Sequence, residues 1–312
     1  MAQNEPTVAV TRRNFTTEYH HDTYERLQAR LPNAAASGKS VFLTGAGKGI
    51  GISIALAFAR AGPRVIFLCG RTRATLEETR AKILRETPTI RAEVIVVDIS
   101  KGVAECLRAL AAARTFDSGR PVDILINNAA YLASAHVVGD DDSVAHVQEQ
   151  FEANWKHYEV NVKGSLALAT AFLRNCVPRN PVIINISSGA AVLDYVPGIG
   201  CYASSKLATL KMYSDLGFEE TARGSRIFHL HPGSVQTAMS APGARSPDTA
   251  ELSADFAVWL TSPEAQFLHN RLIYANWDVD ELLAKKPTIV SRDYLKIGVT
   301  GWDSTAYSVA DK

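Results

Sequence analysis

The chain has 312 residues, with 33 Lys and Arg against 32 Asp and Glu, which gives a formal net charge of +1. Because the charge is balanced and no dense basic block occurs, we expect no nucleic acid partner and no anionic membrane partner. With 46% hydrophobic residues, the composition is that of a globular protein. No stretch approaches the roughly 20 consecutive apolar residues of a membrane-spanning helix.

The N-terminal residues contain no apolar core of a secretory signal. The four cysteines are scattered and show no C-x-x-C spacing: Cys69, Cys106, Cys176 and Cys201. These features favour a reduced, cytoplasmic compartment.

Residues 1–37 are polar and irregular and predict an N-terminal extension. Within it, residues 22–31 predict a short helix with Asp22 as its N-cap. His20 and His21 could suggest a metal site, but we interpret them as surface residues of an extension that lies on the main domain.

From Ser40 onward, short apolar runs alternate with helical patterns. The predicted strands are residues 41–44, 65–69, 93–97, 122–126, 182–186, 226–230 and 271–275. The predicted helices are residues 52–59, 75–85, 104–114, 144–174, 202–222 and 252–260. The strands are continuously apolar, as expected when helices cover both faces of a parallel sheet.

This alternation predicts an α/β fold, a Rossmann-type doubly wound parallel sheet in a single domain over residues 38–285. Within that domain, residues 236–270 form the expected substrate-binding segment. Residues 286–312 are expected to be a C-terminal tail.

A glycine cluster follows the first predicted strand and opens the first helix: Gly45, Gly47, Lys48, Gly49, Ile50 and Gly51. Glycines at this point allow a tight turn, close approach of the backbone to a pyrophosphate and close helix–strand packing. The helix N-terminus adds free N–H groups and a positive dipole end. The spacing is G-x-x-x-G-x-G rather than G-x-G-x-x-G, and a glycine-rich surface turn is the alternative.

Tyr202 and Lys206 are four residues apart and lie on one face of a predicted helix. An ammonium beside a phenol favours the phenolate, so we expect Lys206 to lower the pKa of Tyr202. Such a tyrosine can act as general acid and base near neutral pH. For the pair alone, the alternative is a packed aromatic residue beside an exposed lysine.

Seven motifs carry a family resemblance: 44–51, Asp98, 127–130, Asn161, Ser188, 202–206 and 232–237. In order and spacing they resemble the short-chain dehydrogenases/reductases, over residues 38 to 280. The segments 15–22 and 275–282 resemble fungal members associated with secondary metabolism. The chain departs from the family pattern at Ala130, where a glycine is usual, and at Gly47, where many relatives have serine.

The resemblance implies a catalytic tetrad of Asn161, Ser188, Tyr202 and Lys206. Tyr202 would pass a proton to the substrate oxygen, and Lys206 would bind the ribose hydroxyls of a nicotinamide cofactor. Ser188 would hold and polarise the substrate carbonyl, and Asn161 would support a water relay to Lys206. The gap from Ser188 to Tyr202 is one residue longer than in the commonest members, so Ser187 is the alternative.

The resemblance also implies cofactor contacts away from the glycine cluster. Asp98 and Ile99 would meet the adenine, and Asn128 the adenosine side. Val235 and Thr237 would meet the nicotinamide carboxamide or the pyrophosphate.

The end of the second predicted strand carries no carboxylate and reads Cys69-Gly70-Arg71-Thr72. An acidic residue there would bind the adenosine 2′-hydroxyl and repel a 2′-phosphate. Arg71 can instead hold a phosphate with its planar fork, and Lys48 adds a second cation. The charges therefore favour NADP(H) over NAD(H); a solvated Arg71 stacked on adenine is the alternative.

The substrate is expected beyond the carboxyl ends of the strands. The candidate walls are apolar and aromatic: Tyr131, Leu132, Leu193, Tyr195, Met239 and Trp259. They suggest a bulky hydrophobic ketone or alcohol, although plain packing is the alternative for each. His229 and His231 alternate on a strand, and we interpret them as core or cleft residues rather than metal ligands.

The leading hypothesis is an NADP(H)-dependent oxidoreductase that reduces ketones or oxidises secondary alcohols on a hydrophobic small molecule, in fungal secondary metabolism. The first alternative is a non-redox isomerase, dehydratase or cyclase on the same scaffold. The second is a non-catalytic NADP(H)-sensing protein. The resemblance further implies a homodimer or homotetramer, and no metal is expected.

Overall fold

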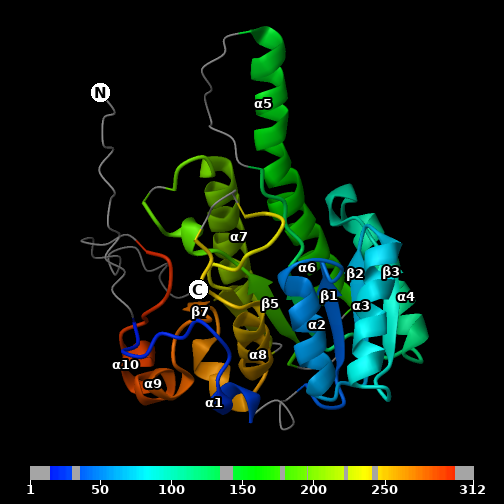
Figure 1. Cartoon of the computed structure of the whole chain (residues 1–312), viewed down its shortest axis with the longest axis vertical. Helices are drawn as coiled ribbons and strands as arrows, with labels where there is room; N and C mark the ends of the chain where they lie inside the picture. Colours follow the sequence, from blue (N-terminus) through cyan, green and yellow to red (C-terminus); the bar gives the residue numbers. More distant parts are fainter. Residues whose placement is uncertain are drawn as a thin grey trace, which may run out of the picture.

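The computed structural model describes residues 15–29, 36–133, 143–175, 180–194, 196–220, 224–240 and 245–298. Its centre is one sheet of seven parallel strands in the order β3-β2-β1-β4-β5-β6-β7 (Figure 1). The strands are β1 (Ser40–Thr44), β2 (Val65–Gly70), β3 (Ala92–Val96), β4 (Ile124–Asn127), β5 (Val182–Ile186), β6 (Arg226–His231) and β7 (Leu272–Tyr274). This order confirms the predicted doubly wound sheet, since the chain reverses direction across the sheet between β1 and β4.

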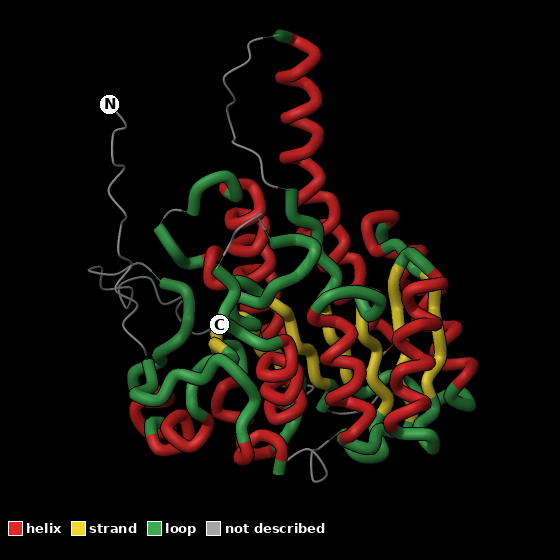
Figure 2. Tube along the Cα trace, viewed as in Figure 1, coloured by secondary structure: helices red, strands yellow, loops and turns green. Residues whose placement is uncertain are grey.

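Helices lie on both sides of the sheet (Figure 2). The helices are α1 (Glu25–Gln28), α2 (Ile50–Arg60), α3 (Arg73–Glu86), α4 (Val103–Phe116), α5 (Val144–His157), α6 (Ser165–Asn175), α7 (Gly200–Glu219), α8 (Ala250–Leu260), α9 (Val279–Ala284) and α10 (Lys286–Ser291). None of the helices within the described ranges is long and apolar enough to cross a membrane.

Alternating side chains of each strand enter two separate cores. Val41 and Leu43 of β1 pack in one core with Phe58 of α2. Phe42, between them, packs in the other core with Phe172 of α6. All three β1 side chains are fully buried, which explains why the strand sequences show no polar alternation.

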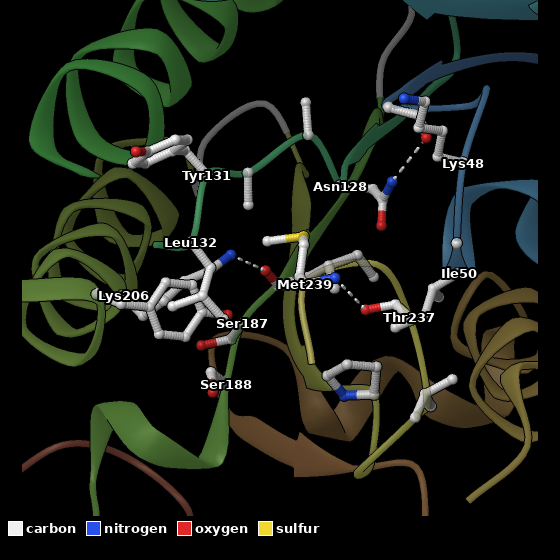
Figure 3. A pocket seen from close by; sticks show the side chains of 18 of the residues that line it. Lys48, Ile50, Asn128, Tyr131, Leu132, Ser187, Ser188, Lys206, Thr237 and Met239 are labelled. Carbon is white, nitrogen blue, oxygen red and sulfur yellow. Dashed lines mark hydrogen bonds between the residues drawn. The ribbon is translucent and has the colours of Figure 1, made fainter. Parts of the chain in front are cut away.

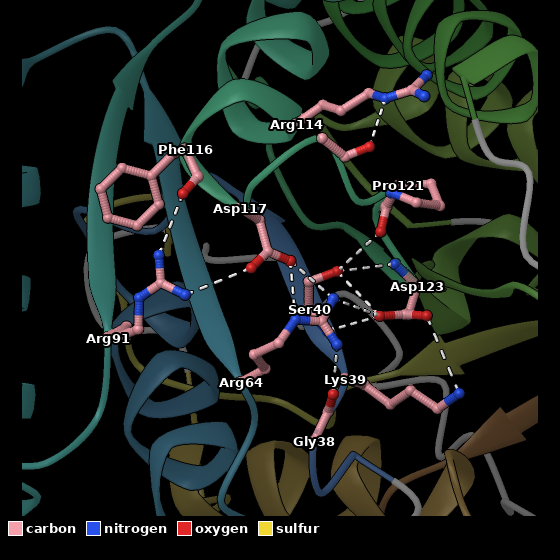
Figure 4. A network of polar contacts seen from close by, with 11 residues as sticks. Gly38, Lys39, Ser40, Arg64, Arg91, Arg114, Phe116, Asp117, Pro121 and Asp123 are labelled. Carbon is pink, nitrogen blue, oxygen red and sulfur yellow. Dashed lines mark hydrogen bonds and ion pairs between the residues drawn. The ribbon is translucent and has the colours of Figure 1, made fainter.

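The amino ends of the strands are tied together by an ionic network (Figure 4). Asp117, at the end of α4, is 2% exposed and pairs with Arg64 at 2.7 Å and with Arg91 at 3.4 Å. Asp123, before β4, accepts the backbone N–H of Ser40 at 2.8 Å and pairs with Arg64 at 3.3 Å. This network fixes β1, β2 and β4 relative to α4 at the edge opposite the carboxyl ends.

Residues 15–29, here called the N-terminal strap, lie on the sheet domain. Tyr19 forms an antiparallel bridge with Trp277, and the N–H of His20 donates to the Asn276 carbonyl at 2.8 Å. The expected helix is shorter than predicted, because α1 begins at Glu25. The prediction that Asp22 caps it is wrong, since the Asp22 carboxylate accepts from the Thr249 hydroxyl instead.

The long predicted helix 144–174 contains a π-helical segment, Tyr158–Gly164, between α5 and α6. A π-helical turn adds a residue per turn and often occurs at functional sites. Here it carries Asn161 at its centre, 2% exposed.

Candidate active site

One large pocket, about 1080 Å³ in volume, lies at the carboxyl ends of the strands (Figure 3). In open α/β sheets this edge, at the point where strand order reverses, is where ligands bind. The pocket brings together most of the predicted site residues: Gly45, Gly47, Lys48, Gly49, Ile50, Arg71, Asp98, Ile99, Asn128, Ser188, Tyr202, Lys206, Val235 and Thr237. Gly51 and Asn161 do not line it, but they contact residues that do.

The glycine turn between β1 and α2 leaves no room for a side chain at Gly45, Gly47 or Gly51. A Cβ on Gly51 would lie 2.1 Å from the Gly45 carbonyl oxygen, and Gly45 itself has a φ of +69°. Gly49, the N-cap of α2, provides no capping side chain. The first N–H groups of α2 therefore have no side-chain cap, which suits the binding of a phosphate.

Asn128 holds this turn in place from the end of β4. Its amide Nδ2 donates to the Thr44 carbonyl at 2.9 Å and to the Gly45 carbonyl at 3.3 Å. The Thr44 hydroxyl in turn accepts the N–H of Asn128 at 3.1 Å. Asn128 therefore both anchors the glycine turn and lines the pocket.

The end of the pocket next to β2 and the glycine turn carries two exposed cations, Lys48 and Arg71. Asp98, after β3, lines the same end of the pocket, and its Oδ1 accepts from the Ser100 N–H and hydroxyl at 3.1 and 2.7 Å. Ile99 is 4% exposed and packs against Gly164 of the π-helical segment. This end of the pocket therefore combines the apolar Ile99 with two cations and the Asp98 carboxylate.

The opposite end holds Ser188, which follows β5, and Tyr202, in the first turn of α7. The Ser188 side chain is near enough to the Tyr202 hydroxyl to act on it, and it lowers the pKa of that phenol. Ser188 Oγ also accepts the N–H of Ala190 at 3.2 Å. Ser187 is 2% exposed, and its Oγ has no partner among the described atoms. The contact with Tyr202 favours Ser188 over Ser187 as the serine of the site.

The expectation that Lys206 lowers the pKa of Tyr202 is wrong for this geometry. Burial raises the pKa of Tyr202, and the Ser188 side chain offsets only part of that effect. Lys206 Nζ lies 5.8 Å from the Tyr202 ring centroid and donates to the Ile186 carbonyl at 2.8 Å. Burial also lowers the pKa of Lys206, to about 8.

Asn161 connects the π-helical segment to the pocket wall. Its Oδ1 accepts the N–H of Tyr131 at 2.8 Å, and its Nδ2 donates to the Tyr131 carbonyl at 3.0 Å. The same Nδ2 donates to Ser205 Oγ at 3.0 Å, on the helix that carries Tyr202. Asn161 therefore fixes both Tyr131 and α7.

Four of the expected substrate walls line the pocket: Tyr131, Leu132, Leu193 and Met239. Tyr195 lies outside the described residues. Trp259 was predicted wrongly: it is 1% exposed on α8, where its Nε1 donates to Glu264 at 2.7 Å. Of the described residues in the expected segment 236–270, only 237–240 and 246 line the pocket, because α8 packs in the core against α2.

Three aromatic residues of the pocket were missed: Tyr19, Tyr274 and Trp277. Tyr274 ends β7 at the same sheet edge as Ser188, and this position could have identified it. The residues around Tyr19 in the sequence do not indicate that it lines the pocket, because its position depends on the N-terminal strap packing against residues that follow β7.

The two histidines of β6 have separate environments. His229 is fully buried, where burial lowers its pKa to about 4. His231 lines the pocket and accepts the N–H of Gly189 on Nδ1 at 2.9 Å. Within the described ranges, no group of three or more His, Cys, Asp and Glu side chains could hold a metal ion.

This geometry defines a class of protein: an α/β fold in which a glycine-rich turn, a serine, a tyrosine and a lysine line one pocket. A family model for short chain dehydrogenases matches residues 39–247. The chain belongs to the short chain dehydrogenase family, which supports an oxidoreductase function.

Its similar curated proteins include two from fungi. The short chain dehydrogenase citE of Monascus ruber is 32% identical over 294 residues, covering 91% of this chain and 95% of that protein. A short chain dehydrogenase/reductase of Claviceps purpurea is 34% identical over 294 residues, covering 91% and 94%. Among solved structures, the Pseudomonas aeruginosa RhlG/NADP active-site complex superposes with a TM-score of 0.65 at 20% identity, covering 76% of this chain and 94% of that one.

Proposed function

We propose that this chain is an NADP(H)-dependent oxidoreductase that interconverts a ketone and a secondary alcohol on a hydrophobic small molecule. The observation that carries the proposal is the continuity of one pocket. Its lining runs from the glycine turn and Arg71 to Ser188 and Tyr202. A dinucleotide that lies along it would bring its reactive end to the acid–base pair.

The residues present fit such a cofactor. The glycine turn excludes side chains where a pyrophosphate would approach, and the uncapped start of α2 supplies donors. Asp98, Ile99 and Asn128 would contact the adenosine, and Val235 and Thr237 the nicotinamide half. When bound, the cofactor supplies or accepts the hydride.

The preference for NADP(H) rests on charge at the end of β2. Arg71 follows Gly70 directly, and Lys48 lies on the same pocket. Neither has an ion pair with a carboxylate among the described residues. Both can therefore bind a 2′-phosphate. The NADP of the P. aeruginosa complex agrees with this preference.

The chain's own residues handle the proton. The Tyr202 hydroxyl donates to the substrate oxygen, where Ser188 Oγ donates a second hydrogen bond to the developing negative charge. The Lys206 ammonium would bind the ribose hydroxyls of the cofactor. Asn161 fixes α7 through Ser205 and would orient water toward Lys206.

We also propose a homodimer or homotetramer, a cytoplasmic location and a role in fungal secondary metabolism. The assembly is supported by α5, which projects from the body (Figure 1) and exposes Phe151 and Trp155 by 57% and 50%. Their rings stack at 6.4 Å. Light scattering should give a mass of two or four chains, and Trp155→Asp should lower it.

The test of the activity is NADPH oxidation at 340 nm with a panel of hydrophobic ketones. Tyr202→Phe should reduce kcat at least 100-fold, because the proton donor is lost. Tyr294→Phe, at an exposed tyrosine outside the pocket, is the matched control. Unchanged activity in Tyr202→Phe would sink the mechanism. Product formed without net NADPH consumption would indicate an isomerase, dehydratase or cyclase, and NADPH binding without any turnover would indicate a sensor.

A further inference from the structure

The segment that follows β6, residues 233–237, is here called the β6 loop. Ser234, Val235 and Thr237 of this loop line the pocket. Asp248 binds both backbone groups of Ser234, because its Oδ2 accepts the Ser234 N–H at 2.5 Å and its own N–H donates to the Ser234 carbonyl at 3.1 Å. Val235 also forms a parallel bridge with Asp248. Asp248 therefore holds the start of the β6 loop.

The Asp248 carboxylate packs directly on the backbone of this loop. Gly233 has a φ of +91°, and a Cβ there would lie 2.6 Å from Asp248 Oδ2. The Asp248 side chain is only 2% exposed. A buried carboxylate loses its hydration, so each of its oxygens needs a hydrogen-bond donor from the protein. Since Ser234 serves Oδ2, Oδ1 needs a donor from elsewhere.

That donor comes from the N-terminal strap. His21 Nδ1 lies 2.5 Å from Asp248 Oδ1. A carboxylate oxygen only accepts, so the ring proton of His21 is on Nδ1. The backbone supports this contact, because the His21 carbonyl accepts the Thr249 N–H at 2.8 Å and Asp22 accepts from the Thr249 hydroxyl at 2.7 Å. The strap thus holds Asp248 and the residue after it.

His21 reaches the pocket only through Asp248. Its own side chain is 55% exposed and is not among the residues that line the pocket. Without the His21 donor, the carboxylate would gain by turning toward water, and the Ser234 N–H would lose its acceptor. A ligand that binds against the β6 loop would then have to order the loop first, which costs affinity.

We propose that His21 is a positioning residue, which acts through Asp248 to hold the β6 loop for the nicotinamide half of the cofactor. This inference rests on the proposed function for the direction of the cofactor, with its adenosine half at the glycine turn and its nicotinamide half at Val235 and Thr237. The strap is then part of the cofactor site, although His21 and Asp248 are 227 residues apart in the sequence.

The test compares two ligands of the full chain by isothermal titration calorimetry. NADPH contacts both halves of the site, whereas adenosine 2′,5′-bisphosphate carries the adenosine and its 2′-phosphate but no nicotinamide. His21→Ala should raise the dissociation constant of NADPH about fivefold, the equivalent of one net hydrogen bond. The dissociation constant of adenosine 2′,5′-bisphosphate should stay as in the wild type. Because the His21 side chain is half exposed, this substitution removes little packing.

Three further variants separate positioning from a general loosening of the strap. His21→Asn places an amide N–H near the position of Nδ1 and should restore the NADPH affinity to within about twofold. His20→Ala breaks the neighbouring pair with Asp278, 3.0 Å long, and is the matched control that should leave the NADPH affinity unchanged. In an Asp248→Ala background, His21→Ala should have no further effect, because the two residues act as one unit.

The inference is overturned if His21→Ala weakens both ligands equally or neither, if His20→Ala weakens NADPH as much, or if the effects of His21→Ala and Asp248→Ala add. Failure of the proposed function gives a different result. A selective loss of NADPH affinity in a protein that reduces no ketone would keep the positioning role and remove the redox proposal. Ketone reduction with an unchanged NADPH affinity in His21→Ala would remove the positioning role alone.

Discussion

The ammonium nitrogen of Lys206 lies 2.8 Å from the carbonyl oxygen of Ile186, the last residue of β5. This bond holds a lysine that is only 6% exposed at the strand end from which Ser187 and Ser188 follow. A cation in such a place loses most of its hydration, so burial lowers the pKa of Lys206 to about 8.

The first prediction concerns the pH dependence of ketone reduction. Below about pH 8 Lys206 carries a proton and can bind the ribose hydroxyls of the cofactor as an ammonium; above it that charge is lost. We expect kcat/KM to fall above pH 8, about tenfold per pH unit. The exposed Lys211 on the same helix is the control, and Lys211→Gln should keep the same profile. A profile that stays flat to pH 10 would exclude this role of Lys206.

The second prediction concerns cofactor choice. Arg71→Asp places a carboxylate at the end of β2, which should repel a 2′-phosphate and accept the ribose hydroxyls. The ratio of kcat/KM for NADPH over NADH should fall at least 100-fold. Arg73, exposed and paired with Glu77 outside the pocket, is the matched control through Arg73→Ala. If the ratio is equal in the two variants, Arg71 does not select the cofactor.

The third prediction concerns stability at the amino ends of the strands. Asp117→Asn leaves Arg64 and Arg91 without their buried carboxylate (Figure 4). We expect a loss of roughly 2–3 kcal/mol in the free energy of unfolding, less than for a fully buried pair because both arginines keep contact with water. Urea denaturation measures it.

The control for Asp117 is Glu105→Gln, which breaks the exposed pair with Arg108 on the same helix. It should change stability by less than about 1 kcal/mol. Equal effects of the two substitutions would contradict a structural role for the network. The NADPH dissociation constant should not change in either variant, because the network lies at the opposite edge from the pocket.

The fourth prediction concerns the N-terminal strap. The backbone N–H groups of Glu18 and Thr17 lower the pKa of Glu281 to about 2. Because the folded pKa lies below the usual value, this contribution to stability is present above about pH 4.5 and is lost as the pH falls toward 2. Hydrogen exchange of residues 15–24 should accelerate over that window beyond the intrinsic rate.

Glu281→Ala should loosen the strap at pH 7, and chymotrypsin should then cut near Phe15, Tyr19 or Tyr24 faster than in the wild type. Glu78→Ala, at an exposed carboxylate of α3, is the control. Resistance to chymotrypsin equal to that of the wild type would show that the remaining contacts of the strap suffice.

The local parts of the site could be predicted from the sequence. The glycine turn depends on residues within one strand–helix connection, and Tyr202 and Lys206 on the spacing of one helix. The strand predictions were correct to within two residues at their ends, because a strand buried on both faces is an uninterrupted apolar run. The parallel, doubly wound arrangement of the strands followed from the alternation with helices.

What could not be predicted depends on packing between remote segments. From the sequence alone, Trp259 cannot be distinguished from an aromatic residue of the pocket. In the structure, residues 252–260 of α8 are all buried, and the Trp259 Nε1 donates to Glu264. The pKa of Tyr202 depends on how deeply the fold buries it, which the spacing to Lys206 does not show. The π-helical segment around Asn161 likewise leaves no mark in the apolar periodicity.

The strap has a consequence for how this protein could change its substrate. Tyr19, Tyr274 and Trp277 all lie outside residues 39–247, the range that the family model matches, whereas Ser188, Tyr202 and Lys206 lie inside it. The two ends of the chain thus add aromatic side chains to the pocket, whereas the residues proposed for the chemistry lie in the middle. New specificities could then arise by exchanging both ends together, while the hydride-transfer machinery is inherited intact.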